Sequence, residues 1–307
     1  MTTTAPSGAP VLVLGVTGKT GAAVAHALLA RGIAVRGTTR QPAGGRGLGR
    51  APMGVELVQV DAATGAGLDD AVAGVGAIHH SAPNLSVDEV PMLARTIAAA
   101  YRAGVRRVVF HSVMHPYVPT MAHHLRKAQA EHLLRTSGLG WTILQPAAYF
   151  QNLLGSVLAG HLSLPYSLDR TFTNVDLRDV AEASATVLLD EAHLHATYEL
   201  AGPDELDAHT MAAQARVVLG FPVAAARTTA PATNDPATKD PASTSELRAM
   251  FDYYDAHGFV GSPHVLAMLL GRRPTSWSQF LADMAPQIGR PLTPSSAGVV
   301  PSDSTGP

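Results

Sequence analysis

Three glycines spaced three residues apart near the start of the chain, Gly15, Gly18 and Gly21, carry the clearest chemistry in the sequence. The apolar run 11–14 before them is typical of a buried parallel strand, and the Ala/Leu-rich run 22–31 after them favours a helix. A strand that turns on glycines into a helix can bind a dinucleotide pyrophosphate, because the backbone approaches the phosphates and the helix N-terminus holds negative charge. An ordinary glycine-rich turn is the alternative. The loop residues expected to contact the cofactor are Gly15, Thr17, Gly18, Lys19, Thr20 and Gly21.

The end of the second predicted strand, residues 34–39, indicates which dinucleotide fits. A site for NAD(H) usually places an acidic side chain there, to bind the ribose 2′-hydroxyl. This strand instead ends on Arg40, and no acidic residue precedes Glu56. A guanidinium matches the geometry and charge of a 2′-phosphate, so the sequence predicts NADP(H) in preference to NAD(H). The alternative is a solvated basic loop, since the first 50 residues also carry Lys19, Arg31, Arg36, Arg46 and Arg50.

The composition fits one globular α/β protein without thiol chemistry. The chain has 307 residues, 46% of them hydrophobic and 15% charged, enough for one large domain and a smaller one. A net charge of −2 gives no indication of nucleic-acid or anionic-membrane binding, and the lack of cysteine excludes disulfides and a cysteine nucleophile. No run approaches the ~18–20 apolar residues of a membrane span, and the N-terminus lacks the features of a secretory signal. We therefore expect a cytoplasmic protein.

Strands and helices alternate regularly through the first half of the chain. Because a helix follows each strand, the pattern predicts a doubly wound parallel sheet with the ligand at the carboxyl ends of the strands. Ser81 and Pro83 follow the fourth strand and therefore join the expected cofactor residues. The predicted strands are 11–14, 34–39, 55–60, 77–80, 107–111 and 141–144, and the predicted helices are 22–31, 68–75, 90–103 and 122–136.

The regular alternation ends near residue 150. The predicted elements beyond it are strands at 172–177 and 197–201, helices at 179–189, 208–219, 247–256, 263–270 and 276–284, and a long irregular loop at 222–244. The tail is rich in Pro, Ser and Gly, which predicts disorder. The predicted division is a flexible N-terminus at 1–9, a dinucleotide-binding domain at 10–150, a smaller, mainly helical substrate-binding region at 151–288 that interleaves with the sheet, and a disordered tail at 289–307.

Several segments match the motifs of one family. The glycine loop has the spacing Gly-x-x-Gly-x-x-Gly with Thr17 before the middle glycine, and residues 145–152 follow the pattern Arg-Pro-x-x-Phe-x-x-Asn with Gln145 replacing the arginine. The other matching segments are Asn174–Glu182, Tyr198–Pro203, Tyr254–Gly258 and Leu269–Trp277. Together these segments, which span about residues 10–285, resemble the NmrA-like branch of the atypical short-chain dehydrogenase/reductases.

This resemblance implies a fold and roles for single residues. The fold is an NAD(P)-binding Rossmann domain with a smaller C-terminal substrate domain. Arg40 stands where NADPH-dependent members carry the arginine that binds the 2′-phosphate. Asp61 stands where relatives bind the adenine amino group, and a helix N-cap is the alternative role for this residue.

The same resemblance implies a catalytic set. In the wider superfamily, a serine after the fifth strand and a Tyr-x-x-x-Lys pair on the next helix carry out the chemistry. Ser112 and Lys127 stand at the serine and lysine positions, and His123 stands at the tyrosine position. Residues four apart share one helix face, so Lys127 should bind the cofactor beside His123 and lower the pKa of its imidazole. The resemblance therefore implies Ser112, His123 and Lys127 as catalytic residues and leaves the proton donor open.

Other side chains near the expected active site leave alternatives. His123 could be a surface residue, with Lys127 alone touching the cofactor. Tyr117 and Tyr149 could donate the proton instead, or could form pocket walls. The expected substrate pocket comprises Tyr117, Tyr149, Phe150 and Asn152.

A cluster of histidines in this region invites a metal interpretation, which the sequence does not favour. Between His111 and His124 there is no Asp, Glu or Cys to complete a ligand set, so we predict no metal. The clustered residues are His111, His115, His123, His124 and His132.

These features together predict an NADPH-dependent oxidoreductase. It would reduce a small, largely apolar carbonyl, imine or conjugated alkene by hydride transfer, as a monomer or homodimer. Two alternatives remain: a catalytically silent NADP(H)-sensing regulator that binds a protein partner, and a non-redox isomerase or cyclase. Lys127 favours the enzyme, and the missing tyrosine favours the sensor.

Overall fold

The structure, a computed structural model, describes residues 8–40, 51–228 and 241–287. Three sequence predictions fall wholly or mostly outside these ranges: the flexible N-terminus, the disordered tail, and the part of the basic loop that holds Arg46 and Arg50. The middle of the predicted loop 222–244 also lies outside the described residues.

Seven parallel strands form the main sheet, in the order β3-β2-β1-β4-β5-β6-β8. The predicted doubly wound, Rossmann-type sheet is therefore confirmed. The strand order reverses between β1 and β4, and the carboxyl ends of these two strands mark the place where such sheets bind ligands. The strands are β1 (Val11–Val13), β2 (Val35–Thr39), β3 (Val55–Gln59), β4 (Ala77–His80), β5 (Arg107–His111), β6 (Gly140–Pro146) and β8 (Ala196–Leu200).

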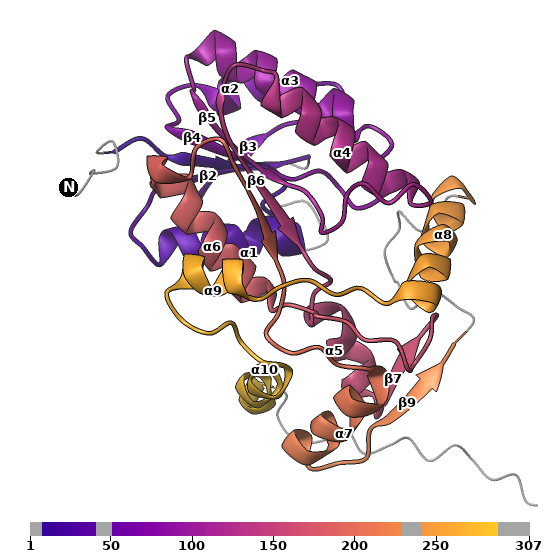
Figure 1. The fold of residues 1–307 in the computed structure, drawn as a ribbon. Helices are drawn as coiled ribbons and strands as arrows, with labels where there is room; N and C mark the ends of the chain where they lie inside the picture. The colour runs from indigo at the N-terminus through magenta and orange to yellow at the C-terminus, as the bar shows by residue number, and fades with distance from the viewer. Residues whose placement is uncertain (1–7, 41–50, 229–240, 288–307) are drawn as a thin grey trace, which may run out of the picture.

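Helices cover both faces of this sheet (Figure 1). Apolar side chains fill the space between the helices and the sheet on each face, in two separate clusters. One face carries α2 (Leu68–Val72), α3 (Glu89–Ala103) and α4 (Ala122–Arg135), and the other carries α1 (Lys19–Leu29) and α6 (Leu177–Leu189).

Side chains alternate between these two faces along the central strands, because successive residues of a strand point in opposite directions. Phe110 packs in the cluster beneath α3 and α4, whereas Val109 packs in the cluster beneath α1 and α6. The same alternation continues past the end of β5. It directs His111 toward the α1 face and Ser112 toward α4, which separates two neighbouring polar side chains.

The second half of the chain completes the main sheet and builds a smaller unit beside it (Figure 1). The predicted strand 172–177 is wrong: Phe172 and Val175 form only isolated bridges, and α6 already begins at Leu177. The predicted irregular loop is wrong at both ends, where β9 and α8 form. The elements are α5 (Gln151–Leu158), β7 (His161–Leu164), α7 (Ala208–Leu219), β9 (Ala224–Arg227), which pairs with β7, α8 (Pro241–His257), α9 (His264–Leu270), α10 (Trp277–Met284), and short 3₁₀ helices at Glu191–His193 and Ala285–Gln287.

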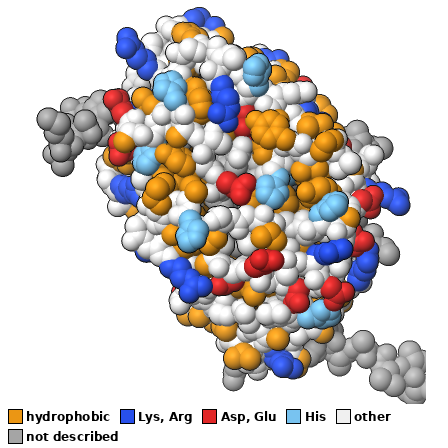
Figure 2. All heavy atoms as spheres, viewed as in Figure 1, with side chains coloured by type: hydrophobic (Ala, Val, Ile, Leu, Met, Phe, Trp, Pro, Cys, Tyr) orange, Lys and Arg blue, Asp and Glu red, His pale blue; other side chains and the backbone are white. Residues whose placement is uncertain are grey.

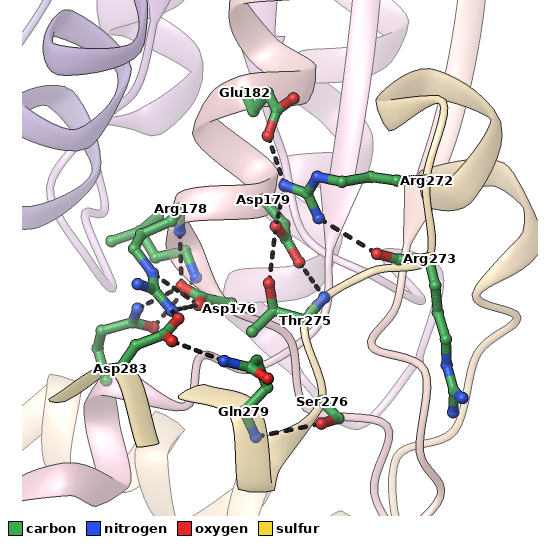
Figure 3. Close-up of polar contacts among 12 residues, drawn as sticks. Asp176, Arg178, Asp179, Glu182, Arg272, Arg273, Thr275, Ser276, Gln279 and Asp283 are labelled. Carbon is green, nitrogen blue, oxygen red and sulfur yellow. Dashed lines mark hydrogen bonds and ion pairs between the residues drawn. The ribbon is translucent and has the colours of Figure 1, made fainter. Parts of the chain in front are cut away.

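A buried carboxylate, Asp179 on α6, ties the C-terminal segment to the main sheet (Figure 3). It is 1% exposed and accepts hydrogen bonds from the backbone N–H and the hydroxyl of Thr275 and from the guanidinium of Arg272. A buried charge needs such partners, because an unpaired one is very costly. Two of the matching sequence segments, 174–182 and 269–277, therefore meet at one structural junction.

The surface is mixed in charge on the face drawn in Figure 2, where basic and acidic side chains lie interspersed among apolar ones. Among the described residues, no helix combines the length and the apolar character needed to cross a membrane.

Candidate functional site

The glycine loop joins the carboxyl end of β1 to the start of α1. Gly15 has a φ of +65°, a conformation that side chains strain, and its N–H donates to the Thr38 hydroxyl on β2 at 3.0 Å. Gly18 is the N-cap of α1 and has no side chain to cap the helix. The first-turn N–H groups of a helix lack acceptors within it, so this loop leaves a backbone cradle that fits a pyrophosphate.

Gly21 has a different role from the other two glycines. It lies inside α1, and a Cβ there would overlap the backbone carbonyl oxygen of Gly15. A Cβ on Gly18 would instead lie 3.2 Å from the same oxygen, a tight contact without that overlap. The third glycine therefore allows helix and loop to pack, and the second keeps the cradle open.

Of the basic residues around β2, Arg31 and Arg36 bind other parts of the protein, whereas Arg40 is exposed. Arg36 pairs with Glu56 at 3.1 Å and also bonds two backbone carbonyls. Arg31 donates to the carbonyl of Glu182 on α6. Arg40 is exposed at the end of β2, and none of the ion pairs in the described part of the chain involves it. An exposed arginine at this position is consistent with the predicted contact to a 2′-phosphate. That contact stays a prediction.

The other expected cofactor residues lie along the same edge of the sheet. The Ser81 hydroxyl donates to the Leu14 carbonyl at 3.4 Å, which joins the ends of β4 and β1, and Pro83 is exposed beyond it. The Asp61 carboxylate accepts from the Ala63 N–H at 3.0 Å and so closes a turn. The predicted helix N-cap role of Asp61 is wrong, since Gly67 stands at the N-cap of α2.

The loop after β6 is fixed against the start of α1. The Lys19 ammonium donates to the side-chain carbonyl of Asn152 at 2.7 Å, and the Thr20 hydroxyl bonds the phenol oxygen of Tyr149. The structure therefore brings together four predicted residues from two distant segments of the chain: Lys19, Thr20, Tyr149 and Asn152.

Tyr149 also contacts a row of buried histidines. Its hydroxyl oxygen lies 2.6 Å from Nε2 of His111, and the His111 ring centroid lies 5.6 Å from that of His79. Within the described residues, Nδ1 of His111 and both ring nitrogens of His79 have no partner. Burial lowers the pKa of His79 to about 4 and that of His111 well below its usual range, so both rings are neutral at pH 7. Burial raises the pKa of Tyr149, which the bond from Thr20 opposes.

Lys127 lies on α4 and faces the end of β5. Its ammonium donates to the carboxylate of Glu89 at 2.9 Å and to the carbonyl of His111 at 3.0 Å, and lies 5.2 Å from the Phe110 ring centroid. The Glu89 side chain is 3% exposed and that of Lys127 is 15% exposed. The ammonium has three N–H donors, so one remains for a ligand.

Ser112 lies on the α4 side of β5, facing the helix that carries Lys127. Its hydroxyl donates to Glu131 at 2.6 Å, and the same carboxylate oxygen accepts from Gln145 at 2.7 Å. Ser112 is 4% exposed and Glu131 is fully buried. The role of Ser112 as a donor to a substrate carbonyl stays a prediction, and in this structure its hydroxyl proton is occupied by Glu131.

His123 and its neighbour His124 occupy the first turn of α4. Burial, followed by the charges of His124 and Lys127, lowers the pKa of His123 to about 3. The predicted lowering is thus found, with burial as its main cause. A ring that is neutral at pH 7 holds no readily released proton, so the structure weakens the case for His123 as the acid. No group of three or more potential ligands among the described His, Asp and Glu residues could hold a metal ion.

A comparison with known families decides the classification of the chain. The NmrA-like family model matches residues 8–281. The chain belongs to the NmrA-like family.

Relatives of this NmrA-like protein include characterised reductases. It is 34% identical over 221 residues to (4-alkanoyl-5-oxo-2,5-dihydrofuran-3-yl)methyl phosphate reductase of Streptomyces griseus, a match that covers 69% of this chain and 75% of that protein. It is 29% identical over 220 residues to the NAD(P)H azoreductase of Xenophilus azovorans, with the same two coverages of 69% and 75%. The NADPH complex of an Escherichia coli NADPH-dependent quinone oxidoreductase superposes with a TM-score of 0.74 at 22% identity, covering 89% of this chain and 99% of that one. At that identity the likeness shows a shared fold.

Two residues predicted for the substrate pocket of this NmrA-like protein differ in exposure. Phe150 is 2% exposed and packs against Trp277 and Phe280 of α10, so it belongs to the core. Tyr117 is 65% exposed on the loop before α4. The contact between His111 and Tyr149 was not predicted. The alternation of side chains along β5 could have placed His111 on the α1 face of the sheet.

The buried histidines predict a pH-dependent stability. His79 and His80 are at most 1% exposed, and burial lowers their pKa values to about 4 and about 3. A histidine in the unfolded chain titrates near ~6.5, so below that pH the unfolded state binds more protons than the folded state. The free energy of unfolding should therefore fall as the pH drops from about 6.5 toward 4, by about 1.4 kcal/mol per pH unit for each histidine. Urea unfolding at pH 7, 6 and 5 measures this slope.

The control for this prediction is His79→Phe, which keeps an aromatic ring and removes one titrating group. Its unfolding free energy should fall less steeply with decreasing pH than that of the wild type. Equal slopes in the two proteins would show that His79 is not held neutral by burial.

Proposed function

We propose that this NmrA-like protein is an NADPH-dependent reductase of a small, largely apolar substrate with an electron-poor carbonyl, imine or conjugated alkene. The observation that carries the proposal is a pair of hydrogen bonds made by the loop after β6: Asn152 accepts from Lys19 at 2.7 Å, and the Tyr149 hydroxyl oxygen lies 2.6 Å from Nε2 of His111. This pair joins the phosphate cradle at the start of α1 to the polar side chains at the end of β5, so one continuous edge of the sheet would offer both cofactor-binding and proton-carrying groups.

Different residues of the chain would bind the pyrophosphate, the 2′-phosphate and the ribose of NADPH. The backbone of the glycine loop would hold the pyrophosphate, and the exposed Arg40 would bind the 2′-phosphate through charge-assisted hydrogen bonds. Lys127 would use its remaining N–H on a ribose hydroxyl, while Glu89 and the His111 carbonyl hold the ammonium in place. When bound, NADPH supplies a hydride to an electron-poor carbon.

The names of the relatives support this substrate class. They include a reductase of an oxo-dihydrofuranyl methyl phosphate, an azoreductase and a quinone oxidoreductase. Each of these names describes a substrate with an electron-poor double bond.

The experiment that tests the proposal combines binding with turnover. The wild type should bind NADPH about tenfold or more tightly than NADH, since one charge-assisted phosphate contact is worth roughly 1.5–3 kcal/mol. It should also oxidise NADPH in the presence of at least one member of a panel of enones, quinones and imines. Arg40→Ala should bring the two affinities close together, measured by fluorescence titration with both nucleotides.

Arg31→Ala is the matched control, because Arg31 is a nearby arginine that bonds α6. This variant should keep the preference for NADPH. Equal binding of NADPH and NADH by the wild type would overturn the cofactor assignment. Tight NADPH binding with no oxidation across the panel would overturn the reductase and favour an NADP(H)-sensing regulator.

A further inference from the structure

A tyrosine hydroxyl reaches the proposed active-site edge from an element other than the one that carries it in the wider superfamily. His123 occupies the tyrosine position on α4, but Tyr149 enters from the loop between β6 and α5. Its phenol oxygen contacts Nε2 of His111 at 2.6 Å and the hydroxyl of Thr20 in the first turn of α1. The hydroxyl is thus anchored from both the cradle side and the β5 side.

We propose that Tyr149 is the proton donor of the reduction, and that His111 and Thr20 are positioning residues that orient its hydroxyl. This inference rests on the proposed function. A phenol oxygen can accept two hydrogen bonds and still donate its own proton. If Nε2 of His111 carries that ring's proton, both neighbours donate to the Tyr149 oxygen, and its O–H is left to point at a third group, the substrate.

Reduction of a carbonyl substrate needs one hydride and one proton. Hydride from NADPH forms a C–H bond as the C=O π bond breaks, and that electron pair moves onto the substrate oxygen. The Tyr149 O–H bond then breaks, and its proton forms the product hydroxyl. The phenolate that remains accepts hydrogen bonds from His111 and Thr20 until a proton from solvent restores it. For a conjugated alkene the enolate oxygen takes the proton in the same way.

The other candidate donors are less suited to this step in the geometry observed. The Ser112 hydroxyl is committed to Glu131 on the opposite side of β5. His123 is neutral at pH 7, so its ring holds no readily released proton, and Lys127 is paired with Glu89. Tyr149 lies in the loop whose Asn152 accepts a hydrogen bond from Lys19 at the start of α1, the helix that forms the phosphate cradle.

The first arm of the test uses substrates whose products differ in basicity. An alkoxide needs a proton donor, since its conjugate acid is about as weak an acid as water. A hydroquinone anion resembles tyrosinate, with a conjugate-acid pKa of about 10, and can wait for solvent. Tyr149→Phe should therefore lower turnover of the best substrate that is reduced at a ketone carbonyl by roughly 10²–10⁴-fold and that of the best quinone by less than about tenfold.

Tyr101→Phe is the matched control, because Tyr101 bonds the Ser137 carbonyl at the far end of α3 and its loss should change neither rate. NADPH affinity and thermal unfolding of Tyr149→Phe should stay close to wild type, which separates lost chemistry from lost folding. Undiminished ketone turnover in a folded Tyr149→Phe protein would overturn the proposal while leaving the reductase in place. A wild type that oxidises no NADPH would instead count against the proposed function.

The second arm examines the protein without cofactor or substrate. Nitrogen-15 NMR of the histidine rings should show His111 protonated at Nε2 and unprotonated at Nδ1, with the signal assigned by its loss in His111→Gln. A ring protonated at Nδ1 would overturn the proposal, because the phenolic proton would then be committed to Nε2. In turnover, His111→Gln keeps an N–H near the Nε2 position and should retain more ketone activity than His111→Leu. Equal losses in these two variants would reduce His111 to a packing role.

Discussion

Gly18→Val is expected to abolish NADPH binding while leaving the fold largely intact. Gly18 lies at φ −81° and ψ 161°, an extended conformation that any residue adopts, so valine causes no backbone strain. Its branched side chain would instead fill the cradle, where even a Cβ lies 3.2 Å from the Gly15 oxygen. Losing two backbone bonds to phosphate, at about 1.5–3 kcal/mol each, would weaken binding by roughly 100-fold or more. Fluorescence titration with NADPH, beside a thermal unfolding curve, measures both effects.

Gly21→Val provides the contrasting variant. Because a Cβ at Gly21 overlaps the Gly15 carbonyl, this substitution should lower the unfolding temperature sharply before any effect on binding can be read. Gly18→Ala should fall between wild type and Gly18→Val in NADPH affinity. Unchanged NADPH affinity in Gly18→Val would mean that the glycine loop is a structural turn and that the nucleotide binds elsewhere.

The sequence could predict the first half of this fold because its signals there are local and strong. The central strands are buried on both faces and rich in apolar residues, such as residues 11–13 and 108–110, and parallel strands of this kind have few competing interpretations. The glycine loop has fixed spacing, and its conformation at Gly15 follows from that residue type. Strand order then follows from the rules that govern doubly wound sheets.

The second half was harder to predict because its elements are short and depend on tertiary contacts. β7 and β9 have four residues each, pair with each other and pack on the apolar core through Leu162, Leu164 and Ala225. The segment 172–177 has the β-branched and aromatic composition of a strand, but it pairs with separate partners at Phe172 and Val175. Propensity alone could not distinguish a strand from such a linker, since tertiary context decides the outcome.

The candidate site was predicted by residue type but not by orientation. Ser112 and His111 are adjacent, and the alternation of side chains along a strand is sufficient by itself to direct them to opposite faces. What the sequence could not supply was the partner of each: Glu131 is 19 residues from Ser112, and Tyr149 is 38 residues from His111. Those contacts arise from the packing of α4 and of the loop after β6.

Lys127→Met is expected to lower both stability and function, and the two effects can be separated. Removing the ammonium leaves the carboxylate of Glu89, 3% exposed, buried without its charge partner. Breaking a buried pair in this way costs about 3–5 kcal/mol of unfolding free energy. Loss of the proposed ribose contact should weaken NADPH binding about tenfold or more, and loss of its charge beside the substrate should lower turnover by roughly 10²–10³-fold.

The double variant Lys127→Met with Glu89→Gln distinguishes a structural lysine from a cofactor-binding one. It removes both charges, so the buried site no longer holds an unpaired carboxylate, and most of the lost stability should return in urea unfolding. NADPH affinity should remain low, because nothing replaces the free N–H of the ammonium. If the double variant instead binds NADPH as tightly as the wild type, Lys127 acts only as the partner of Glu89. The ribose contact would then have to come from another group at the end of β5.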